Sequence, residues 1–264
     1  MAIKDIGFRD ITLFITSLTC SAKRINNILV PMRSLFQYAM DAGIIEKNPF
    51  SRVRNQKVVK PEIHPLSMDE VSAFLNFVPP LYKNFFVVAF FTGMRFGEMA
   101  ALDWRHVDFE RGLIRITKTR VNGEEGSPKT KKSFRDIKMM PPVIDALKDQ
   151  KKLIAGKSDY VFLNHYGRPL HPHSVNLHVW QPTLIKAGLV RRSLYQTRHT
   201  FATLMLDSGE LPGWVQQMMG HVSLQMILEK YYSYIKNYQR DDGNSFMENV
   251  FQRSVKQNVA VTQP

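Results

Sequence analysis

The stretch YQTRHTFATLMLDSGELPGWVQQMMGHVSLQMILEKYY, residues 195–232, decides the fold of the larger part of this chain. Its apolar residues recur at helical spacing and indicate three consecutive short helices. Gly209 and Gly220 mark the ends of the first two, and Pro212 fits the first turn of the second. Ser223 is a candidate N-cap for the third helix. The apolar face of that helix is expected at Leu224, Ile227, Leu228 and Tyr231.

Polar side chains gather at the ends of these predicted helices. Arg198 and His221 both lie at helix boundaries, where side chains and free backbone N–H groups can converge on an anion. Tyr231 lies on the inward side of the third helix. Taken alone, the stretch favours an ordinary helical core with polar ends, so the rest of the chain must be considered.

Charge and cysteine content narrow the class of protein. Among 264 residues, 36 are Lys or Arg and 23 are Asp or Glu, which predicts a polyanionic partner. Cys20 is the sole cysteine, which excludes an internal disulfide and a cysteine-based zinc cluster and fits a reducing cytoplasm. The most apolar run, residues 85–91, is too short to span a bilayer, and the first residues show no signal-peptide pattern.

Residues 1–60 are expected to form a small helical unit. A short helix is predicted over residues 10–15, followed by a longer one capped by Ser21 and kinked or divided at Pro31. Residues 51–61 are basic and lack helical periodicity, so they are interpreted as an interdomain linker. The charges of this linker face solvent or contact phosphates.

A second domain is expected over residues 61–264. Its first predicted helix begins at Ser67, with Glu70 three residues on completing a capping box. Arg95 follows a glycine turn and precedes a new helix, and Glu98 lies one turn further on, where it can hold the guanidinium. A charged pair beside so apolar a helix needs a reason, because buried charge is costly unless paired. A purely structural ion pair is the alternative.

A β-hairpin is predicted next. Residues 112–117 and 133–139 alternate like strands, and the lysines near the turn are Lys129, Lys131 and Lys132. A helix should follow from Pro141, and residues 160–162 form a short predicted strand. The fold class is therefore mainly α with a small β-hairpin sheet (α+β).

In their order along the chain, these segments resemble the tyrosine recombinases, the phage-integrase family. Thr92-Gly93-Met94-Arg95-Phe96-Gly97-Glu98 resembles the first arginine box of the family, and the segment around Lys129 its lysine-bearing hairpin. The segment around Arg198 resembles the second box, normally His-x-x-Arg, and Met219-Gly220-His221 the third.

The resemblance covers roughly residues 62–240 as a catalytic domain. Residues 1–60 resemble the latter part of the helical core-binding domain of the family. This DNA-binding unit is therefore expected to be incomplete at its N-terminus, as in a short family member or a fragment.

By this resemblance, the chain is a site-specific recombinase or integrase that cleaves and rejoins DNA through a covalent 3′-phosphotyrosyl intermediate. Such enzymes serve phage or mobile-element integration and excision. Arg95 and Arg198 would hold the nonbridging phosphate oxygens, because a guanidinium donates bidentate hydrogen bonds and stays charged. Lys129 would act as general acid. His221 would hydrogen-bond the phosphate, and Glu98 would orient Arg95.

The nucleophile lies among neighbouring tyrosines. Tyr231 is ten residues after His221 and Tyr232 eleven, and counting alone leans to Tyr231. Tyr231 also continues the inward stripe of its helix, whereas Tyr232 and Tyr234 point elsewhere. Tyr231 is therefore the predicted nucleophile and Tyr232 the second choice.

Tyr195 departs from the family pattern, because it stands where the second box normally has histidine. Tyrosine can donate a hydrogen bond to phosphate, but with an ordinary pKa of about 10 it is a poor general base. His199 is not a clean substitute, since neighbours on a helix point about 100° apart. A structural role at the helix start is predicted for His199.

The expected partner is double-stranded DNA, held between two lobes, with a tetramer acting on two paired sites. An excisionase or DNA-bending protein is a candidate accessory partner. The protein is expected in the cytoplasm of a bacterium, associated with the nucleoid and not with a membrane. No cofactor or metal is implied; four histidines without cysteine partners surround a turn and a helix start: His165, His171, His173 and His178. The alternatives are a weak or inactive DNA-binding protein that kept the fold, and a type IB topoisomerase.

Overall fold

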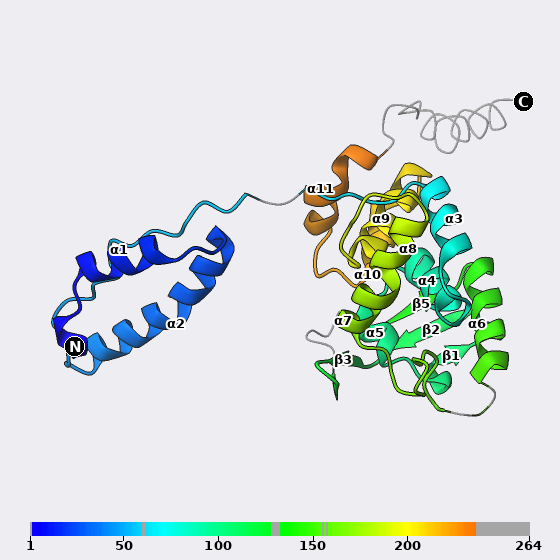
Figure 1. Ribbon diagram of the computed structural model, residues 1–264, viewed down its shortest axis with the longest axis horizontal. Helices are drawn as coiled ribbons and strands as arrows, with labels where there is room; N and C mark the ends of the chain where they lie inside the picture. The colour runs from blue at the N-terminus through cyan, green and yellow to red at the C-terminus, as the bar shows by residue number, and fades with distance from the viewer. Residues whose placement is uncertain (1, 60–61, 128–132, 155, 157, 236–264) are drawn as a thin grey trace, which may run out of the picture. The chain divides into compact units, whose positions relative to one another are not determined.

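The computed structural model describes residues 2–59, 62–127, 133–154, 156 and 158–235. Lys129, the predicted general acid, lies outside the described residues. The chain divides into two compact units, Met1–Glu62 and Ile63–Pro264 (Figure 1). Within the described ranges, every helix is too short or too polar to cross a membrane.

The first unit is a pair of helices. After a 3-10 turn, η1 (Ile3–Asp5), helix α1 (Phe8–Ser17) packs beside α2 (Ala22–Asp41). Ser21 caps α2 as predicted, since its hydroxyl accepts a hydrogen bond from the Arg24 N–H at 3.4 Å. Helix α2 runs unbroken through Pro31, so the predicted division there is wrong. A small core joins the two helices: Ile11, Ile25, Leu29, Phe36 and Phe50.

The first half of the predicted linker belongs to this unit. The Asn26 amide donates to the Gln56 carbonyl at 2.9 Å and accepts from the Gln56 N–H at 2.8 Å. The Arg33 guanidinium donates to the Asn55 side chain at 2.6 Å. Because these bonds hold the backbone against α2, residues 51–56 are part of the helical unit and only the residues after them connect the two units.

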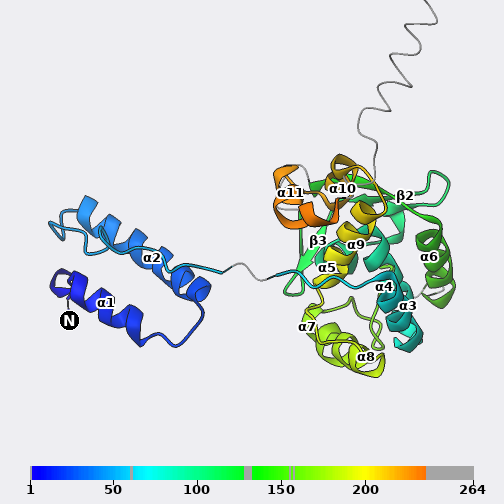
Figure 2. The ribbon, with the colours of Figure 1, turned by 90° about the horizontal axis from the view of Figure 1, so that it is seen from above.

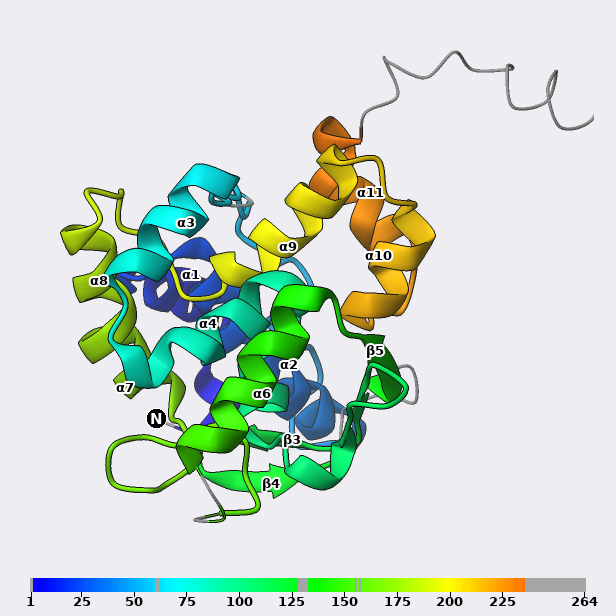
Figure 3. The ribbon, with the colours of Figure 1, turned by 90° about the vertical axis from the view of Figure 1, so that its right-hand side faces the viewer.

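The second unit is built on α4 (Pro80–Thr92), which packs between α6 (Pro141–Ile154) and α9 (Gln196–Asp207) (Figures 1 and 3). Helix α4 is apolar on nearly all sides, as expected of a helix buried in a domain centre. The other helices of this unit that precede α9 are α3 (Met68–Phe77), α5 (Phe96–Ala100), η2 (Trp104–His106), α7 (Pro172–Val175), η4 (Asn176–Trp180) and α8 (Gln181–Lys186). The Ser67–Glu70 capping box at the start of α3 is confirmed.

A three-stranded antiparallel sheet has the strand order β1-β2-β5. Its strands are β1 (Val107–Asp108), β2 (Leu113–Ile116) and β5 (Arg135–Lys138). Ile114 pairs with Ile137, and both are fully buried, so this face of the sheet packs on the core. The two predicted strands are confirmed, and with the helices they confirm the α+β class. The predicted strand at residues 160–162 is wrong: Tyr160 makes only an isolated bridge to Asp103.

A second hairpin, which sequence reasoning missed, is inserted between β2 and β5. Its strands are β3 (Thr119–Val121) and β4 (Glu124–Gly126). Asn122 and Gly123 form the turn with positive φ values of 52° and 88°. An Asn-Gly pair in this conformation is the preferred two-residue hairpin loop, so the dipeptide was a usable signal.

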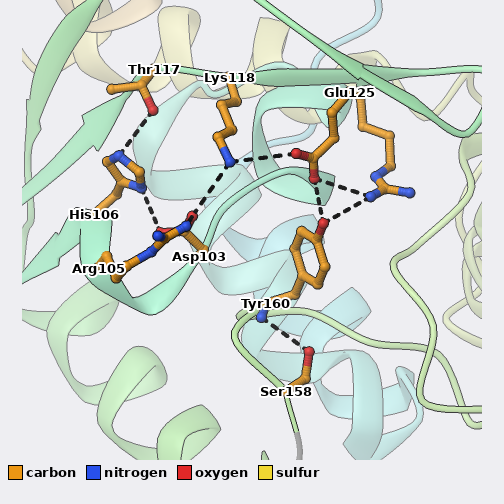
Figure 4. Close-up of polar contacts among 9 residues, drawn as sticks. Asp103, Arg105, His106, Thr117, Lys118, Glu125, Ser158 and Tyr160 are labelled. Atoms are coloured by element: carbon orange, nitrogen blue, oxygen red, sulfur yellow. Dashed lines mark hydrogen bonds and ion pairs between the residues drawn. The ribbon is translucent and has the colours of Figure 1, made fainter.

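A polar network anchors this inserted hairpin to the body of the unit (Figure 4). The buried Asp103 carboxylate binds the His106 imidazole and, at 2.9 Å, the Arg105 guanidinium. Burial acts to raise the pKa of Asp103, but the hydrogen bonds from Arg105 and His106 hold it below its usual range. On the hairpin itself, Glu125 accepts hydrogen bonds from Tyr160 and from a strand arginine. Arg120 and Glu125, on either side of the Asn122-Gly123 turn, both contact the Tyr160 hydroxyl. The inserted hairpin is therefore held against the body of the unit.

The decisive stretch forms the three predicted helices, α9, α10 (Pro212–Met219) and α11 (Gln225–Tyr231), followed by η5 (Tyr232–Tyr234). They pack on one another (Figures 2 and 3), and α10 lies beside β5 (Figure 3). Leu224, and not Ser223, is the N-cap of α11, so that predicted cap is wrong. Of the predicted apolar face, Ile227 and Tyr231 are buried, whereas the remaining two leucines are about two-fifths exposed.

Candidate active site

Arg198 is the most enclosed charged side chain of the candidate site, at 1% exposed. It stands in the first turn of α9, and its guanidinium donates to the Gly93 carbonyl and, at 2.6 Å, to the Met219 carbonyl. Burial lowers the pKa of Arg198 to about 10, so the side chain remains a cation at neutral pH. Backbone carbonyls of two other helix ends therefore fix the position of this charge.

Three guanidinium groups converge on the C-terminal end of α10. The successive carbonyls of residues 218, 219 and 220 accept hydrogen bonds from Arg135, Arg198 and Arg95, at 2.8, 2.6 and 3.3 Å. The last carbonyls of a helix have no partner within the helix and carry the negative end of its dipole. The carbonyls at the end of α10 thus hold three guanidinium groups close to one another.

Glu98 ties two of these arginines together. Its carboxylate, 3% exposed, binds the Arg135 guanidinium through both oxygens at 3.1 and 2.8 Å. It also accepts from the Arg95 guanidinium at 2.8 Å and from the Arg95 N–H at 2.9 Å. Burial acts to raise the pKa of Glu98, but the hydrogen bonds and charge of Arg135 hold it below its usual range.

The predicted contact between Arg95 and Glu98 is therefore present, whereas the contribution of Arg135 was missed. Sequence reasoning treated Arg135 only as part of the hairpin. A signal was available, because residues two apart on a strand share a face and Ile137 is a core residue. Arg135 had to point inward, where a cation needs an anionic partner.

Two glycines allow the arginines this close approach. Gly93 ends α4 with a φ of 63°, and a Cβ atom there would lie 2.4 Å from the Phe201 ring. Gly220 ends α10 with a φ of 64°, and its Cβ would lie 2.9 Å from the Arg135 guanidinium. Positive φ values favour glycine, and both carbonyls concerned accept from a site arginine.

His221 follows α10 and lines a cleft of about 490 Å³ together with Arg95 and Ser133. Its Nδ1 atom is buried and has no hydrogen-bond partner among the described residues, and the same holds for Nε of Arg198. Burial, followed by the charges of Arg198 and Arg95, lowers the pKa of His221 to about 3, so the ring is neutral. Buried polar atoms are rarely left unpaired, so these two atoms point to a polar ligand.

Tyr195 lies beside this cleft and is 49% exposed. Together with Arg95 and Arg198 it lines a smaller cavity of about 170 Å³. The residue in the histidine position of the second box is therefore next to both arginines. Its ring also lies 5.1 Å from that of His199.

The neighbouring tyrosines of the C-terminal helix have opposite environments. Tyr231 is 1% exposed and Tyr232 is 62% exposed, which agrees with the predicted inward face for Tyr231. The Tyr231 hydroxyl lies 2.6 Å from Nδ1 of His199, itself buried. Burial raises the pKa of Tyr231. His199 thus contacts the candidate nucleophile, whereas the sequence suggested only a structural role at the helix start.

The described residues bring most of the predicted site together. Four of them line two adjoining cavities: Arg95, Tyr195, Arg198 and His221. Glu98 supports this group. The Tyr231 hydroxyl contacts His199, whose ring lies 5.1 Å from that of Tyr195. No cluster of histidine, cysteine or acidic side chains within the described ranges could hold a metal ion.

The fold is shared with solved integrases. The Tn1549 transposon integrase in complex with a circular intermediate DNA superposes with a TM-score of 0.71 at 23% identity, covering 94% of this chain and 86% of that one. A λ integrase tetramer bound to a Holliday junction gives a TM-score of 0.66 at 17% identity, over 84% of this chain and 66% of that one. These structures define the class of fold as that of the tyrosine recombinases.

The phage integrase family model matches residues 64–237, and the chain belongs to this family. Prophage integrase IntR of Escherichia coli is 30% identical over 80% of this chain. The ICEBs1 integrase of Bacillus subtilis is 26% identical over 90% of this chain and 70% of its own length. The chain spans 57% of the length of IntR, so the match covers little more than half of that relative.

Proposed function

We propose that this chain is a site-specific recombinase that cleaves and rejoins DNA strands through a 3′-phosphotyrosyl intermediate. The observation that carries the proposal is the group of Arg95, Arg198 and His221 around two adjoining cavities that share Arg95, with polar atoms of the latter two buried and unpaired within the described residues. A phosphodiester bound at these cavities would supply the missing acceptor oxygens. Guanidinium groups are suited to this task because they keep their charge and donate two hydrogen bonds at once.

The residues divide the reaction between them. The Tyr231 oxygen attacks phosphorus, the Tyr–O–P bond forms, and the bond to the 5′-oxygen breaks. Arg95 and Arg198 stabilise the charge that develops on the nonbridging oxygens. By family resemblance, Lys129 gives the leaving 5′-oxygen its proton. The covalent link keeps the phosphodiester energy, so rejoining is the reverse of the same step.

Double-stranded DNA is the proposed substrate. The charge of the chain and the DNA in the solved structures of the Tn1549 and λ integrases support this part of the proposal. We extend the λ arrangement to this chain as a tetramer on two paired sites, with the helical unit as a second DNA-binding surface. An excisionase or a DNA-bending protein is the proposed accessory partner, and the nucleoid the proposed place of action.

A trapping experiment tests the proposal. Duplexes that the full chain binds are first selected from a randomised pool, and the selected site is then nicked so that cleavage releases a short strand and cannot be reversed. We expect a covalent protein–DNA adduct that survives denaturing gels, with the linked peptide containing Tyr231. Tyr231→Phe should bind the DNA and form no adduct, whereas the matched control Tyr232→Phe should form it normally. An adduct that survives in Tyr231→Phe and is lost in Tyr232→Phe would move the nucleophile by one residue.

Two observations favour a second candidate, a DNA-binding protein with weak or no activity. Tyr195 occupies the position of a box histidine, and a relative 29% identical over 80% of this chain, IntQ of Escherichia coli, is named a putative defective protein. The same experiment separates the two functions. Specific binding of the selected duplex with no adduct at any pH would establish the inactive protein.

A further inference from the structure

We propose that His199 accepts the proton of the Tyr231 hydroxyl when that oxygen attacks the DNA phosphate. The inference rests on the proposed recombinase activity and adds a catalytic residue to it. Its basis is the direct contact of Nδ1 of His199 with the Tyr231 oxygen, at 2.6 Å, between two side chains that are 7% and 1% exposed. The contact joins residues 32 positions apart, on α9 and α11.

The geometry gives each atom one role. A neutral phenol has a single O–H donor, and a neutral imidazole has one nitrogen that accepts. The hydroxyl therefore donates to Nδ1 when the ring carries its hydrogen on Nε2. At this distance the pair is within the reach required of a nucleophile and its general base.

Helix α9 places the base beside the cation that binds the phosphate. His199 directly follows Arg198, and the two side chains point about 100° apart. Arg198 lines the smaller cavity, whereas His199 contacts Tyr231 of α11. One turn of α9 thus positions both the cation proposed to bind the phosphate and the base proposed to act on the nucleophile. Among the described residues, no other histidine is recorded in contact with the Tyr231 oxygen.

Tyr195 makes the reassignment necessary. A neutral phenol is a very weak proton acceptor, so Tyr195 is not suited to serve as the base. Its ring instead lies 5.1 Å from the His199 ring, and the Tyr231 ring lies 5.7 Å from the same imidazole. We assign Tyr195 to the enclosure of His199 and the base function to His199 itself.

The protonation states fit this assignment. Burial, then the charges of Lys230 and Arg198, lower the pKa of His199 to about 4, so the ring is unprotonated at neutral pH and can accept. Burial raises the pKa of Tyr231, with Arg198 opposing and Tyr195 adding to the rise, so the phenol keeps its proton until attack. A phosphate bound between Arg95 and Arg198 offsets their positive charge, which raises the pKa of His199 while the Tyr231 oxygen attacks.

The step balances as follows. The Tyr231 oxygen forms its bond to phosphorus while its proton passes to Nδ1 of His199. The bond from phosphorus to the 5′-oxygen breaks, and the general acid protonates that oxygen. In rejoining, the 5′-hydroxyl attacks phosphorus and gives its proton back to the general acid. The bond between phosphorus and the Tyr231 oxygen breaks, and His199 returns its proton to that oxygen.

Two substitutions separate proton transfer from positioning. In His199→Asn the amide can occupy the place of Nδ1 and hold the hydroxyl, but it cannot take a proton. In His199→Leu both functions are lost at similar volume. The readout is the single-turnover rate of adduct formation on the nicked duplex, with His178→Asn, a substitution at an exposed histidine of η4, as matched control. Folding and DNA affinity of each variant are measured alongside.

We expect His199→Asn and His199→Leu to slow cleavage alike, by about 100-fold or more, with DNA affinity unchanged. The wild-type rate should level off above the pKa of His199 in the complex, whereas the rate of His199→Asn should keep rising with pH as hydroxide takes over. A His199→Asn protein that cleaves at the wild-type rate with the wild-type pH profile would overturn the inference and leave the recombinase proposal intact. Absence of an adduct from the wild-type protein would instead remove the proposed function itself.

Discussion

At the residue scale, buried polar groups of the second unit gather at the candidate site. Glu98, Arg198, His199 and His221 are 3%, 1%, 7% and 6% exposed. Burial of such groups costs free energy unless each finds a partner, and for the two histidines the cost is expressed as lowered pKa values. The buried histidines therefore affect the free energy of unfolding as well as the proposed activity.

Acid should destabilise the second unit through His199. The pKa of His199 is about 4 in the folded chain against about 6.5 when exposed, so between these values the unfolded chain binds more protons. The stabilising contribution of the neutral His199 is therefore fully present above the pKa of the unfolded chain, about 6.5. It is lost as the pH falls toward the pKa of the folded chain, about 4. Between about pH 7.5 and pH 5, we expect wild type to lose about 2 kcal/mol more than His199→Asn.

Urea unfolding followed by tryptophan fluorescence measures this difference. The three tryptophans, Trp104, Trp180 and Trp214, all lie in the second unit, so the signal reports that unit alone. His221 titrates in both proteins, and its contribution cancels. Equal losses in wild type and His199→Asn would contradict the lowered pKa of His199.

Tyr195→His restores the residue that the second box normally carries. Tyr195 is half exposed and lines the smaller cavity, so the exchange removes little packing. We expect DNA binding to be unchanged and cleavage to be kept or raised, by up to about 100-fold, because an imidazole beside both arginines adds acid–base capacity. The measurement is the single-turnover rate on the nicked duplex. Complete loss of cleavage would mean that Tyr195 does not occupy the histidine position.

At the element scale, helix ends and not helix faces build the site. Carbonyls at the end of α10 accept hydrogen bonds from three guanidinium groups. The Gly93 carbonyl at the end of α4 accepts a further hydrogen bond from Arg198. Both ends close on a glycine with positive φ. The conformations of these glycines therefore determine where the cations lie.

Gly93→Ala should destabilise the second unit more than Gly188→Ala. Both glycines have positive φ, 63° and 70°, so alanine carries a conformational cost of about 1 kcal/mol at either position. At Gly188 nothing lies within 4 Å of the new Cβ, whereas at Gly93 the Phe201 ring lies 2.4 Å away. Overpacking at Gly93 should add about 1–3 kcal/mol, measured by urea unfolding. Equal effects would show that Phe201 moves aside freely.

At the scale of the whole molecule, positive charge is spread over both units. The first 62 residues carry ten Lys or Arg and five Asp or Glu, within a chain of net charge +13. A charge that is distributed in this way favours many phosphate contacts over one concentrated patch. Each contact releases counterions, so affinity for DNA depends on salt.

DNA affinity should fall steeply with salt, by roughly 10³-fold between about 50 and about 200 mM, if about six phosphates are contacted. A chain of residues 63–264 alone should bind more weakly and with a shallower salt dependence. Fluorescence anisotropy on the selected duplex measures both. Identical affinity and salt dependence for the two proteins would remove the helical unit from the proposed DNA-binding surface.

Local pattern was sufficient for much of the second unit. The capping box at Ser67, the paired strands around Ile114 and Ile137, and the three helices of residues 195–232 were all predictable from sequence. Such features depend on neighbours a few positions away, and caps and periodicity record those neighbours directly. The predicted division of the helix at Pro31, the Ser223 cap and the strand at residues 160–162 were wrong, because packing and long-range pairing overrode the local signal.

The sequence by itself determined the family boxes, the α+β class and the inward face of Tyr231. Only the tertiary structure decided which groups meet: Arg135 with Glu98 across 37 positions, and His199 with Tyr231 across 32. The physical reason is that a hydrogen bond between distant segments requires two elements to pack at one distance and one rotation. No periodicity within either segment records that distance, so the partner of His199 became visible only when α9 and α11 were placed side by side.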